Sequence, residues 1–313
     1  MNGGRLGTGR AAVMLACLSS TAVISAQTPP GPSQRFEIAI VRIDGALVPF
    51  AAYDREQWTQ AWPDAWNYPG LRSIWQRRGE AIPGEWHVWR LSGGSPIDGH
   101  VTGRARVNAH CLDVPALLTD LPKAAWQSNA APVPTFGIAT HGDVSVTTIE
   151  RLNDADEAWQ RAEKIVLADF DRRETAAREE SSQSVTETPS PRARLKELYR
   201  ERDSASSPSY FVAQKVYRRG PIGDPGCGPQ TVMTGWLLPM PDGSHRLFAV
   251  KVFLTDCDWK GPSTLVPTAK IATTSGRSFW IAGEFGYEDE SNVIFEIKRL
   301  GVQRVLQTSG GGC

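Results

Sequence analysis

Residues 36–52 read FEIAIVRIDGALVPFAA, two apolar runs joined by the dipeptide Asp44-Gly45. An Asp-Gly pair between apolar runs suits a two-residue type I′ turn, because both residues tolerate the left-handed backbone region that this turn requires. The stretch therefore predicts a β-hairpin made of residues 36–43 and 46–52. It is the strongest local pattern in the chain, and it indicates a protein built mainly from antiparallel strands.

Strand patterns recur in both halves of the chain. Apolar runs bounded by glycine and proline predict strands at residues 86–91, 100–107, 133–140, 144–152, 210–217, 231–238, 245–255, 265–273, 278–287 and 292–299. The short turns Pro241-Asp242-Gly243 and Ser275-Gly276 require antiparallel neighbours, because a parallel connection needs about a dozen residues. We expect a mainly β (β-rich α+β) fold, hairpin-rich in its N-terminal half, with an antiparallel meander, barrel or sandwich in its C-terminal half.

Residues 154–180 interrupt the β pattern. Apolar residues recur there at spacings of three and four, in the order Ala155, Trp159, Ala162, Val166 and Phe170. This spacing predicts one long amphipathic helix, and Asp154 with Glu157 forms a capping-box pair at its start.

The chain divides into five predicted segments. They are a signal peptide (1–26), an extended leader (27–35), a β-rich domain ending in the helix (36–180), a flexible linker with a short charged helix near residues 192–202 (181–208), and an antiparallel β domain (209–313). Residues 181–191 are too poor in apolar side chains to repay the entropy of ordering. The same patterns also allow the two β-rich halves to belong to one sheet system, with the helix packed against it.

The first 26 residues carry the pattern of a secretory signal. Arg5 and Arg10 precede an apolar run at residues 11–18, and the small-residue site Ile24-Ser25-Ala26 follows. The mature chain would then begin at Gln27 and be secreted or periplasmic. No later run approaches the roughly 20 apolar residues of a spanning helix, so we expect no transmembrane segment after signal removal.

Charge gives no reason to expect a nucleic-acid partner. The signal holds two of the 34 basic residues and none of the 34 acidic ones, so the mature chain has a small negative formal charge. Binding to a phosphate backbone needs clustered Lys and Arg, whereas the basic residues here alternate with acids.

The mature chain has four cysteines, an even number that favours disulfides in an oxidising compartment. A three-residue turn at Pro241-Asp242-Gly243 would place Met240 opposite Ser244, and the same register would place Cys227 opposite Cys257. Opposed positions of an antiparallel pair are close enough for a disulfide. By elimination, Cys111 would pair with Cys313 at the end of the glycine-rich tail.

No motif specifies a catalytic, metal or cofactor chemistry. Cys227-Gly228-Pro229-Gln230 lacks the second cysteine of a redox motif and precedes a strand rather than a helix. His110 and Cys111 fall on opposite faces of an extended chain, and no second ligand pair has zinc spacing. A Gly-x-Ser-x-Gly elbow is absent. We therefore expect no catalytic residues, no metal and no cofactor.

Aromatic residues crowd into residues 58–89. Six tryptophans there would present about 1,200 Å² of surface, more than the roughly 300 to 600 Å² apolar patch of a typical monomer, so most must be buried. The loop at residues 62–70, with prolines near both ends, is the expected exception. Its candidate ligand-binding residues suit stacking on a sugar ring with hydrogen bonds to hydroxyls, and they are Trp62, Asp64, Trp66, Asn67 and Tyr68.

A second candidate site is a pair of carboxylates. Trp280 and Glu284 share a face of one predicted strand, and Glu296 lies on the next strand. Two carboxyl groups at a defined separation are needed for glycoside hydrolysis. A cross-strand contact between glutamate and lysine on a solvated face is the competing interpretation.

The expected function is non-catalytic binding by an exported protein, with a glycan or another cell-envelope component as the ligand of the aromatic loop. One alternative is a secreted hydrolase that uses dispersed carboxylates or a histidine. A second is a structural envelope protein. The sequence does not decide whether the protein is an enzyme, and it names no substrate or oligomeric state.

Overall fold

The computed structural model describes residues 34–42, 44–61, 81–91, 94–109, 112–121, 135–181, 191–202, 204, 206–217, 229–255, 263–286 and 289–312. The first strands are β1 (Phe36–Arg42), β2 (Leu47–Asp54), β3 (Gln57–Gln60), β4 (Glu85–Arg90), β5 (Ile97–Ala109), β6 (Leu112–Thr119), β7 (Thr135–His141) and β8 (Ser145–Arg151). Helix α2 (Glu157–Ser181) follows. The later strands are β9 (Arg194–Glu201), β10 (Ser209–Val216), β11 (Gln230–Pro239), β12 (His245–Thr255), β13 (Thr264–Ala272), β14 (Ser278–Phe285), β15 (Asp289–Lys298) and β16 (Gly301–Gly312).

Seven strands form the first sheet, in the order β1-β7-β4-β5-β6-β2-β3. Because β1 also pairs with β2, six of these strands close into a barrel, and β3 is attached to β2 alone. The barrel interior is filled by Ala39, Val41, Leu47, Ala61, Trp86, Val88, Leu117, Leu121 and Ala139. The prediction of a mainly β fold with one long helix is confirmed. The closed barrel, however, lies in the N-terminal half.

The hairpin of β1 and β2 forms as predicted, but its turn differs. Arg42 N donates to Ala46 O at 2.9 Å and Gly45 N donates to Arg42 O at 3.0 Å, so three residues connect the strands. Gly45 has a φ of 81°, whereas Asp44 has no positive φ. Asp44 Oδ1 instead accepts from Ala46 N at 3.1 Å. The aspartate therefore acts through its side chain, and of Asp44 and Gly45 only the glycine takes the left-handed conformation.

A true two-residue turn with two positive φ angles joins β2 to β3, where no sequence signal predicted it. Arg55 and Glu56 have φ values of 51° and 63°. Such angles are uncommon for residues other than glycine, asparagine and aspartate. Contacts from the turn between β13 and β14 hold the conformation, since Arg277 Nη1 donates to Glu56 O at 2.7 Å and Ser275 Oγ lies 3.1 Å from Glu56 Oε2.

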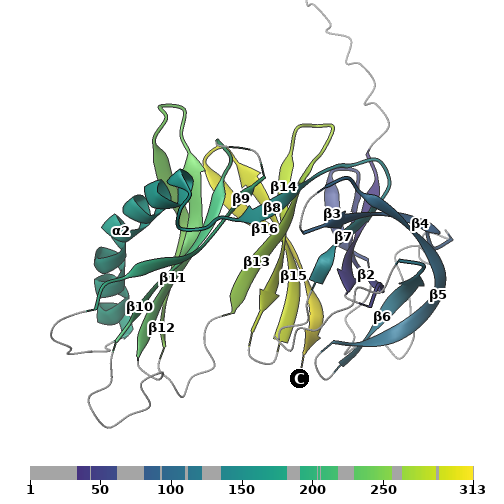
Figure 1. The fold of residues 1–313 in the computed structure, drawn as a ribbon, viewed down its shortest axis with the longest axis horizontal. Helices are drawn as coiled ribbons and strands as arrows, with labels where there is room; N and C mark the ends of the chain where they lie inside the picture. The colour runs from purple at the N-terminus through teal and green to yellow at the C-terminus, as the bar shows by residue number, and fades with distance from the viewer. Residues whose placement is uncertain are drawn as a thin grey trace, which may run out of the picture. The chain divides into compact units, whose positions relative to one another are not determined.

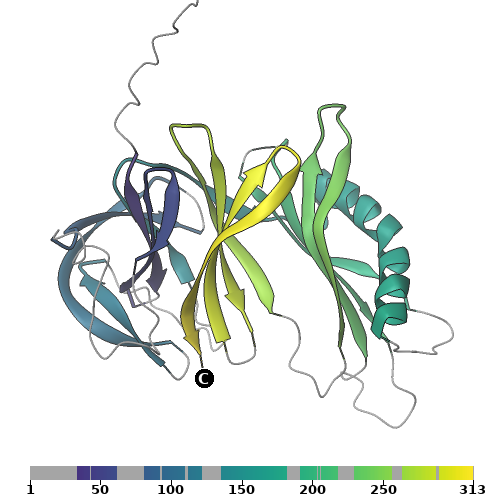
Figure 2. The ribbon, with the colours of Figure 1, turned by 180° about the vertical axis from the view of Figure 1, so that it is seen from behind.

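The second sheet has nine antiparallel strands, in the order β12-β11-β10-β9-β8-β13-β14-β15-β16. It takes β8 from the first predicted domain, β9 from the predicted linker and the other strands from the second predicted domain. Residues 33–313 form one compact unit. Figures 1 and 2 show α2 against β9–β12, with β13–β16 between those strands and the barrel.

Helix α2 begins at Glu157, three residues after its predicted cap, Asp154. Asp156 is the residue before the first helical turn, because Gln160 N donates to Asp156 O at 3.1 Å. Asp156 Oδ2 accepts from Asn153 N at 2.8 Å, so Asn153 and Asp156 replace the predicted pair Asp154 and Glu157. The predicted apolar stripe is correct from Trp159 onward, and it packs on the strands through Trp159, Ala162, Val166 and Phe170.

The predicted charged helix near residues 192–202 is wrong, because this segment forms strand β9 between β8 and β10. Leu195 and Leu198 are three residues apart, a spacing that also occurs on one face of a helix. In the structure a bulge at Lys196 breaks the strand register, and both leucines face α2. Tyr199 faces the opposite side of the sheet. The bulge thus gives a strand the apparent spacing of a helix.

Three further clusters complete the core. The first lies between α2 and β9–β12 and includes Leu198, Phe211 and Met233. The second joins the barrel to β13–β15 through Phe36, Ile38, Phe279 and Ile281, among others. The third covers the other face of β9–β12 and of β13–β15, where Trp236 lies 4.9 Å from Trp280 between ring centroids.

Candidate functional site

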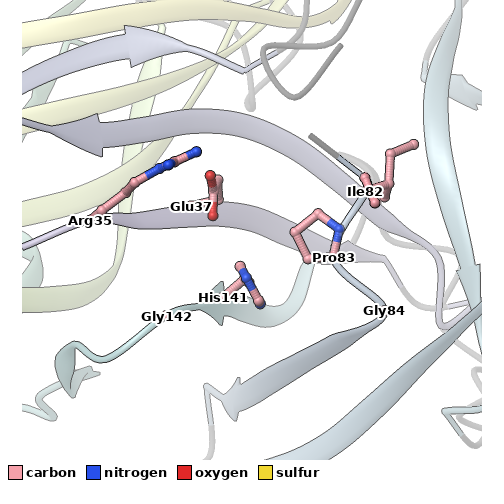
Figure 3. Close-up of a pocket in the computed structure, with 8 residues that line it drawn as sticks. Arg35, Glu37, Ile82, Pro83, Gly84, His141 and Gly142 are labelled. Carbon is pink, nitrogen blue, oxygen red and sulfur yellow. The ribbon is translucent and has the colours of Figure 1, made fainter. Parts of the chain in front are cut away.

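A cavity of about 500 Å³ opens at one end of the barrel (Figure 3). Its charged side chains come from the start of β1 and the end of β7, and its apolar wall comes from the segment that enters β4. The lining residues are Arg35, Glu37, Ala81, Ile82, Pro83, Gly84, His141 and Gly142. Mouths of β-barrels are a common place for small-molecule sites, and typical sites measure roughly 300 to 1,000 Å³.

Strand alternation explains why a glutamate and a histidine meet at this mouth. Ala39 and Ala139 belong to the barrel interior. Glu37 and His141 lie two residues away from them on β1 and β7, so both side chains face the same interior. The two residues are direct cross-strand partners. Opposed side chains of an antiparallel pair have Cβ atoms about 4.5 to 5.5 Å apart.

The carboxylate of this pair is deeply placed, since Glu37 is only 3 % exposed. Arg35, two residues earlier and just before β1, is exposed and also lines the cavity. Figure 3 shows Glu37 and His141 projecting to the same side of their strands, beside Pro83. The site therefore combines a buried acid, a neighbouring imidazole and an exposed guanidinium.

A hydrogen bond fixes which nitrogen of a neutral His141 ring carries the proton. His141 Nδ1 lies 3.0 Å from Glu85 O. A carbonyl oxygen only accepts, so Nδ1 carries a proton in this contact, and in the neutral ring Nε2 is then an acceptor. The ring also packs 5.9 Å from Trp86, measured between centroids. The imidazole is thus oriented by the barrel itself.

The apolar wall is anchored to the barrel by its backbone. Trp86 Nε1 donates to Pro83 O at 3.3 Å, and Val101 N donates to Gly84 O at 2.8 Å. On the other side, Gly142 has a φ of 101°, and a Cβ added there would lie 2.6 Å from Arg35 O. Only glycine permits this close approach of β7 to β1. Both walls of the cavity are therefore held in place without a ligand.

The predicted aromatic site lies outside the described residues, so Trp62, Asp64, Trp66, Asn67 and Tyr68 and their glycan ligand stay a prediction. Among the described tryptophans of the same region, Trp86 is fully buried, and Trp58 and Trp89 are partly buried against the core.

The structure does not bring the predicted carboxylate pair together. Trp280 is fully buried in the aromatic core, on the same face of the sheet as Glu284. Glu296 lies on the opposite face of the sheet. Each carboxylate has its own cation, since Arg304 Nη2 lies 3.2 Å from Glu284 and Arg277 Nε lies 2.7 Å from Glu296. These are cross-strand ion pairs rather than an acid and a nucleophile facing one substrate.

The predicted disulfides also stay predictions, because Cys111, Cys227, Cys257 and Cys313 lie outside the described residues. The strand register from which the disulfide between Cys227 and Cys257 was predicted is present near the turn, where Pro239 lies opposite His245. A bulge with Ala249 at a φ of 47° then shifts the pairing by one residue, so that Gln230 lies opposite Thr255.

A second buried glutamate holds α2 against the sheet. Glu174 accepts hydrogen bonds from Lys215 Nζ and Arg178 Nη2, both at 2.9 Å, and from the hydroxyls of Tyr217 and Thr231. Burial alone would raise its pKa, but these donors lower it to about 2. Because donors surround the carboxylate within the packed core, we assign this cluster a role in stability.

Within the described part of the chain, no group of three or more His, Cys, Asp or Glu side chains has a geometry that could hold a metal. The same residues contain no helix long and apolar enough to cross a membrane. No protein-family model, curated protein or solved structure matches this chain. The geometry of the cavity is therefore the basis for a function.

Sequence reasoning missed Arg35, Glu37 and His141. A signal was present, because Glu37 is the one charged residue in the otherwise apolar run from 36 to 41, and His141 begins the turn after a predicted strand. Their meeting depends on the pairing of β1 with β7, which are about 100 residues apart. One sequence does not reveal that pairing.

Proposed function

We propose that this protein is an exported, non-catalytic binding protein whose ligand site is the cavity at the barrel mouth. The observation that supports this is a cavity of about 500 Å³ in which a buried carboxylate, an oriented imidazole and an exposed guanidinium meet an apolar wall. Ligand sites commonly combine an apolar lining with a few convergent polar groups.

Filling the cavity tests this proposal. A Cβ added at Gly84 meets no atom within 4 Å, so Gly84→Leu places its side chain at the cavity without a backbone clash. We expect small molecules that raise the melting temperature of the wild-type protein to leave that of Gly84→Leu unchanged. The measurement is a thermal-shift screen of a diverse metabolite library against both proteins.

Gly301→Leu is the matched control, because Gly301 also has open space around it and lies at the start of β16. This variant should keep every thermal shift of the wild type. Ligands that stabilise Gly84→Leu as strongly as the wild type would place the site elsewhere and overturn the proposal.

Export is part of the same proposal, and its support is the pattern of Arg5, Arg10 and the run ending at Ala26. The exported form is expected to begin at Gln27 and to contain no free thiol. N-terminal sequencing and a thiol assay on the denatured protein check both points. A cell-associated chain that retains Met1 would contradict export.

Hydrolysis is the second candidate, and one observation favours it. His141 Nε2 is an acceptor in the neutral ring, the Glu85 carbonyl orients that ring, and His141 lines the cavity, as a general base would. Mass spectrometry of each stabilising compound after incubation with the protein separates the two functions. Unchanged compounds support binding, and cleaved compounds support catalysis.

A further inference from the structure

We propose that the cavity at the barrel mouth recognises a small zwitterion, with an ammonium group at Glu37 and His141 and a carboxylate at Arg35. This inference deepens the proposed function and rests on it. The ligand class would be α-amino acids with an apolar side chain, or short peptides of such residues.

The inner end of the cavity is suited to a cation. Glu37 and His141 are cross-strand partners, and both offer acceptors, since the His141 Nδ1 proton is used by Glu85 O. An ammonium group carries three N–H donors, and a carboxylate has about four lone-pair sites. Glu37 can therefore bind a ligand ammonium in addition to its contacts within the protein.

The rim carries the opposite charge. Arg35 lies just before β1 and Glu37 is the second residue of β1, and two residues of extended chain span about 6.6 Å. A guanidinium binds a carboxylate through two parallel hydrogen bonds. A ligand with only one charge would meet one favourable and one unfavourable group. A ligand with both charges, oriented ammonium inward, would satisfy both.

The remaining wall is apolar, with Ala81, Ile82 and Pro83 opposite the charged strands. Burial of an aliphatic group against this wall is favourable in proportion to its area. A polar substituent would find no side-chain partner among these three residues. The geometry therefore favours a hydrocarbon side chain on the zwitterion.

Isothermal titration calorimetry on the full mature chain tests each part of this recognition. The probes are leucine, leucinamide (cation only), 4-methylpentanoate (anion only) and leucyl-leucine. We expect leucine or leucyl-leucine to bind at least about 10-fold more tightly than either singly charged probe, because a hydrogen bond to a charged group is typically worth this factor or more. The stronger of the two zwitterions identifies a free amino acid or a peptide as the source.

Two variants locate the charges. Glu37→Gln should remove the preference for leucine over 4-methylpentanoate, and Arg35→Gln should remove the preference for leucine over leucinamide. Glu180→Gln and Arg161→Gln, at exposed positions of α2, are the matched controls and should leave all affinities unchanged. If Glu37→Gln does not fold, as judged by circular dichroism, the four probes on the wild type decide the question.

The outcomes separate this inference from the proposed function. Equal affinity for leucine and 4-methylpentanoate overturns the inference. If no probe binds but another compound shifts the NMR signals of His141 and Gly142, the inference fails and the binding function stands. If no compound in the library shifts those signals, both fail.

Discussion

Glu174 and Glu290 are both buried glutamates, one on the sheet-facing side of α2 and one on β15, yet their pKa values move in opposite directions. Hydrogen bonds from four donors lower the pKa of Glu174 to about 2, although burial opposes this. Burial raises the pKa of Glu290 to about 7, and the nearby charge of Arg42 only partly offsets it. The surrounding donors, rather than the depth of burial, decide which form of a buried acid the fold favours.

This difference also guides the interpretation of Glu37. It is as deeply buried as Glu174, but it borders a cavity, whereas Glu174 lies within the packed core. A carboxylate enclosed by donors stabilises a fold, whereas one on a cavity wall can also contact a ligand. Comparing the three glutamates thus distinguishes Glu174, which stabilises the fold, from Glu37, which lines the candidate ligand site.

Breaking the network of Glu174 should give the largest effect. Glu174→Leu leaves Lys215 buried without its main counterion, and breaking a buried pair in this way costs about 3 to 5 kcal/mol. Urea denaturation at pH 7 measures the loss in free energy of unfolding. Acid should have a related effect on the wild type, because the contribution of Glu174 is present above its unfolded pKa of 4.5 and is lost as pH falls toward 2.

Glu179→Leu is the control for this substitution, since Glu179 is exposed on the same helix, and it should change stability by less than about 0.5 kcal/mol. The double variant Glu174→Leu with Lys215→Met should recover much of the loss, because no unpaired charge remains buried. A loss below about 1 kcal/mol for Glu174→Leu alone would contradict the role of the network.

Glu290 should produce a smaller effect with the opposite pH dependence. Its folded pKa of about 7 exceeds the unfolded value of 4.5, so the stability from its neutral form is present below pH 4.5 and is lost as pH rises to 7. Relative to Glu290→Gln, the wild type should lose up to about 3 kcal/mol across that range. Urea denaturation of both proteins from pH 4.5 to 8 measures the change. A constant difference between them would show that Glu290 does not titrate in this range.

The smallest effects are expected at the ion pair of Glu284 with Arg304, which is partly exposed. Such pairs contribute about 0 to 1 kcal/mol, because solvent screens them and two long side chains must be ordered. Glu284→Gln should therefore lower the free energy of unfolding by less than about 1 kcal/mol, and less still in 1 M salt. A loss as large as that of Glu174→Leu would show that the exposure of an ion pair does not determine how much it stabilises this protein.

Sequence patterns predicted most of the strands and the body of α2, because their side chains alternate or recur on the period of one regular element. Sequence patterns predicted the ends of these elements less reliably than their interiors. Asn153 and Asp156 bond to each other just before α2 in place of the pair one residue further on, and of Asp44 and Gly45 only the glycine has a positive φ. Several residues can cap or turn a chain at one place, and packing selects among them.

Other elements required the tertiary structure. The glycine-rich tail at residues 310–312 is part of β16 because Gly310 lies against Glu290, where a Cβ would approach Glu290 Cγ to 3.0 Å. Arg55 and Glu56 adopt their unfavourable turn because Arg277 holds it from another sheet. Such contacts join residues more than 200 positions apart or on neighbouring strands, and a local pattern carries no information about them.

The amino-acid sequence by itself therefore determined the class of fold, since alternation along strands and the 3.6-residue period of a helix are properties of short segments. Only the tertiary structure decided which strands are neighbours. That choice closes the barrel by pairing β1 with both β2 and β7, and it places Glu37 beside His141. The candidate site exists because strand pairing is a long-range choice, made by the packing of the whole core.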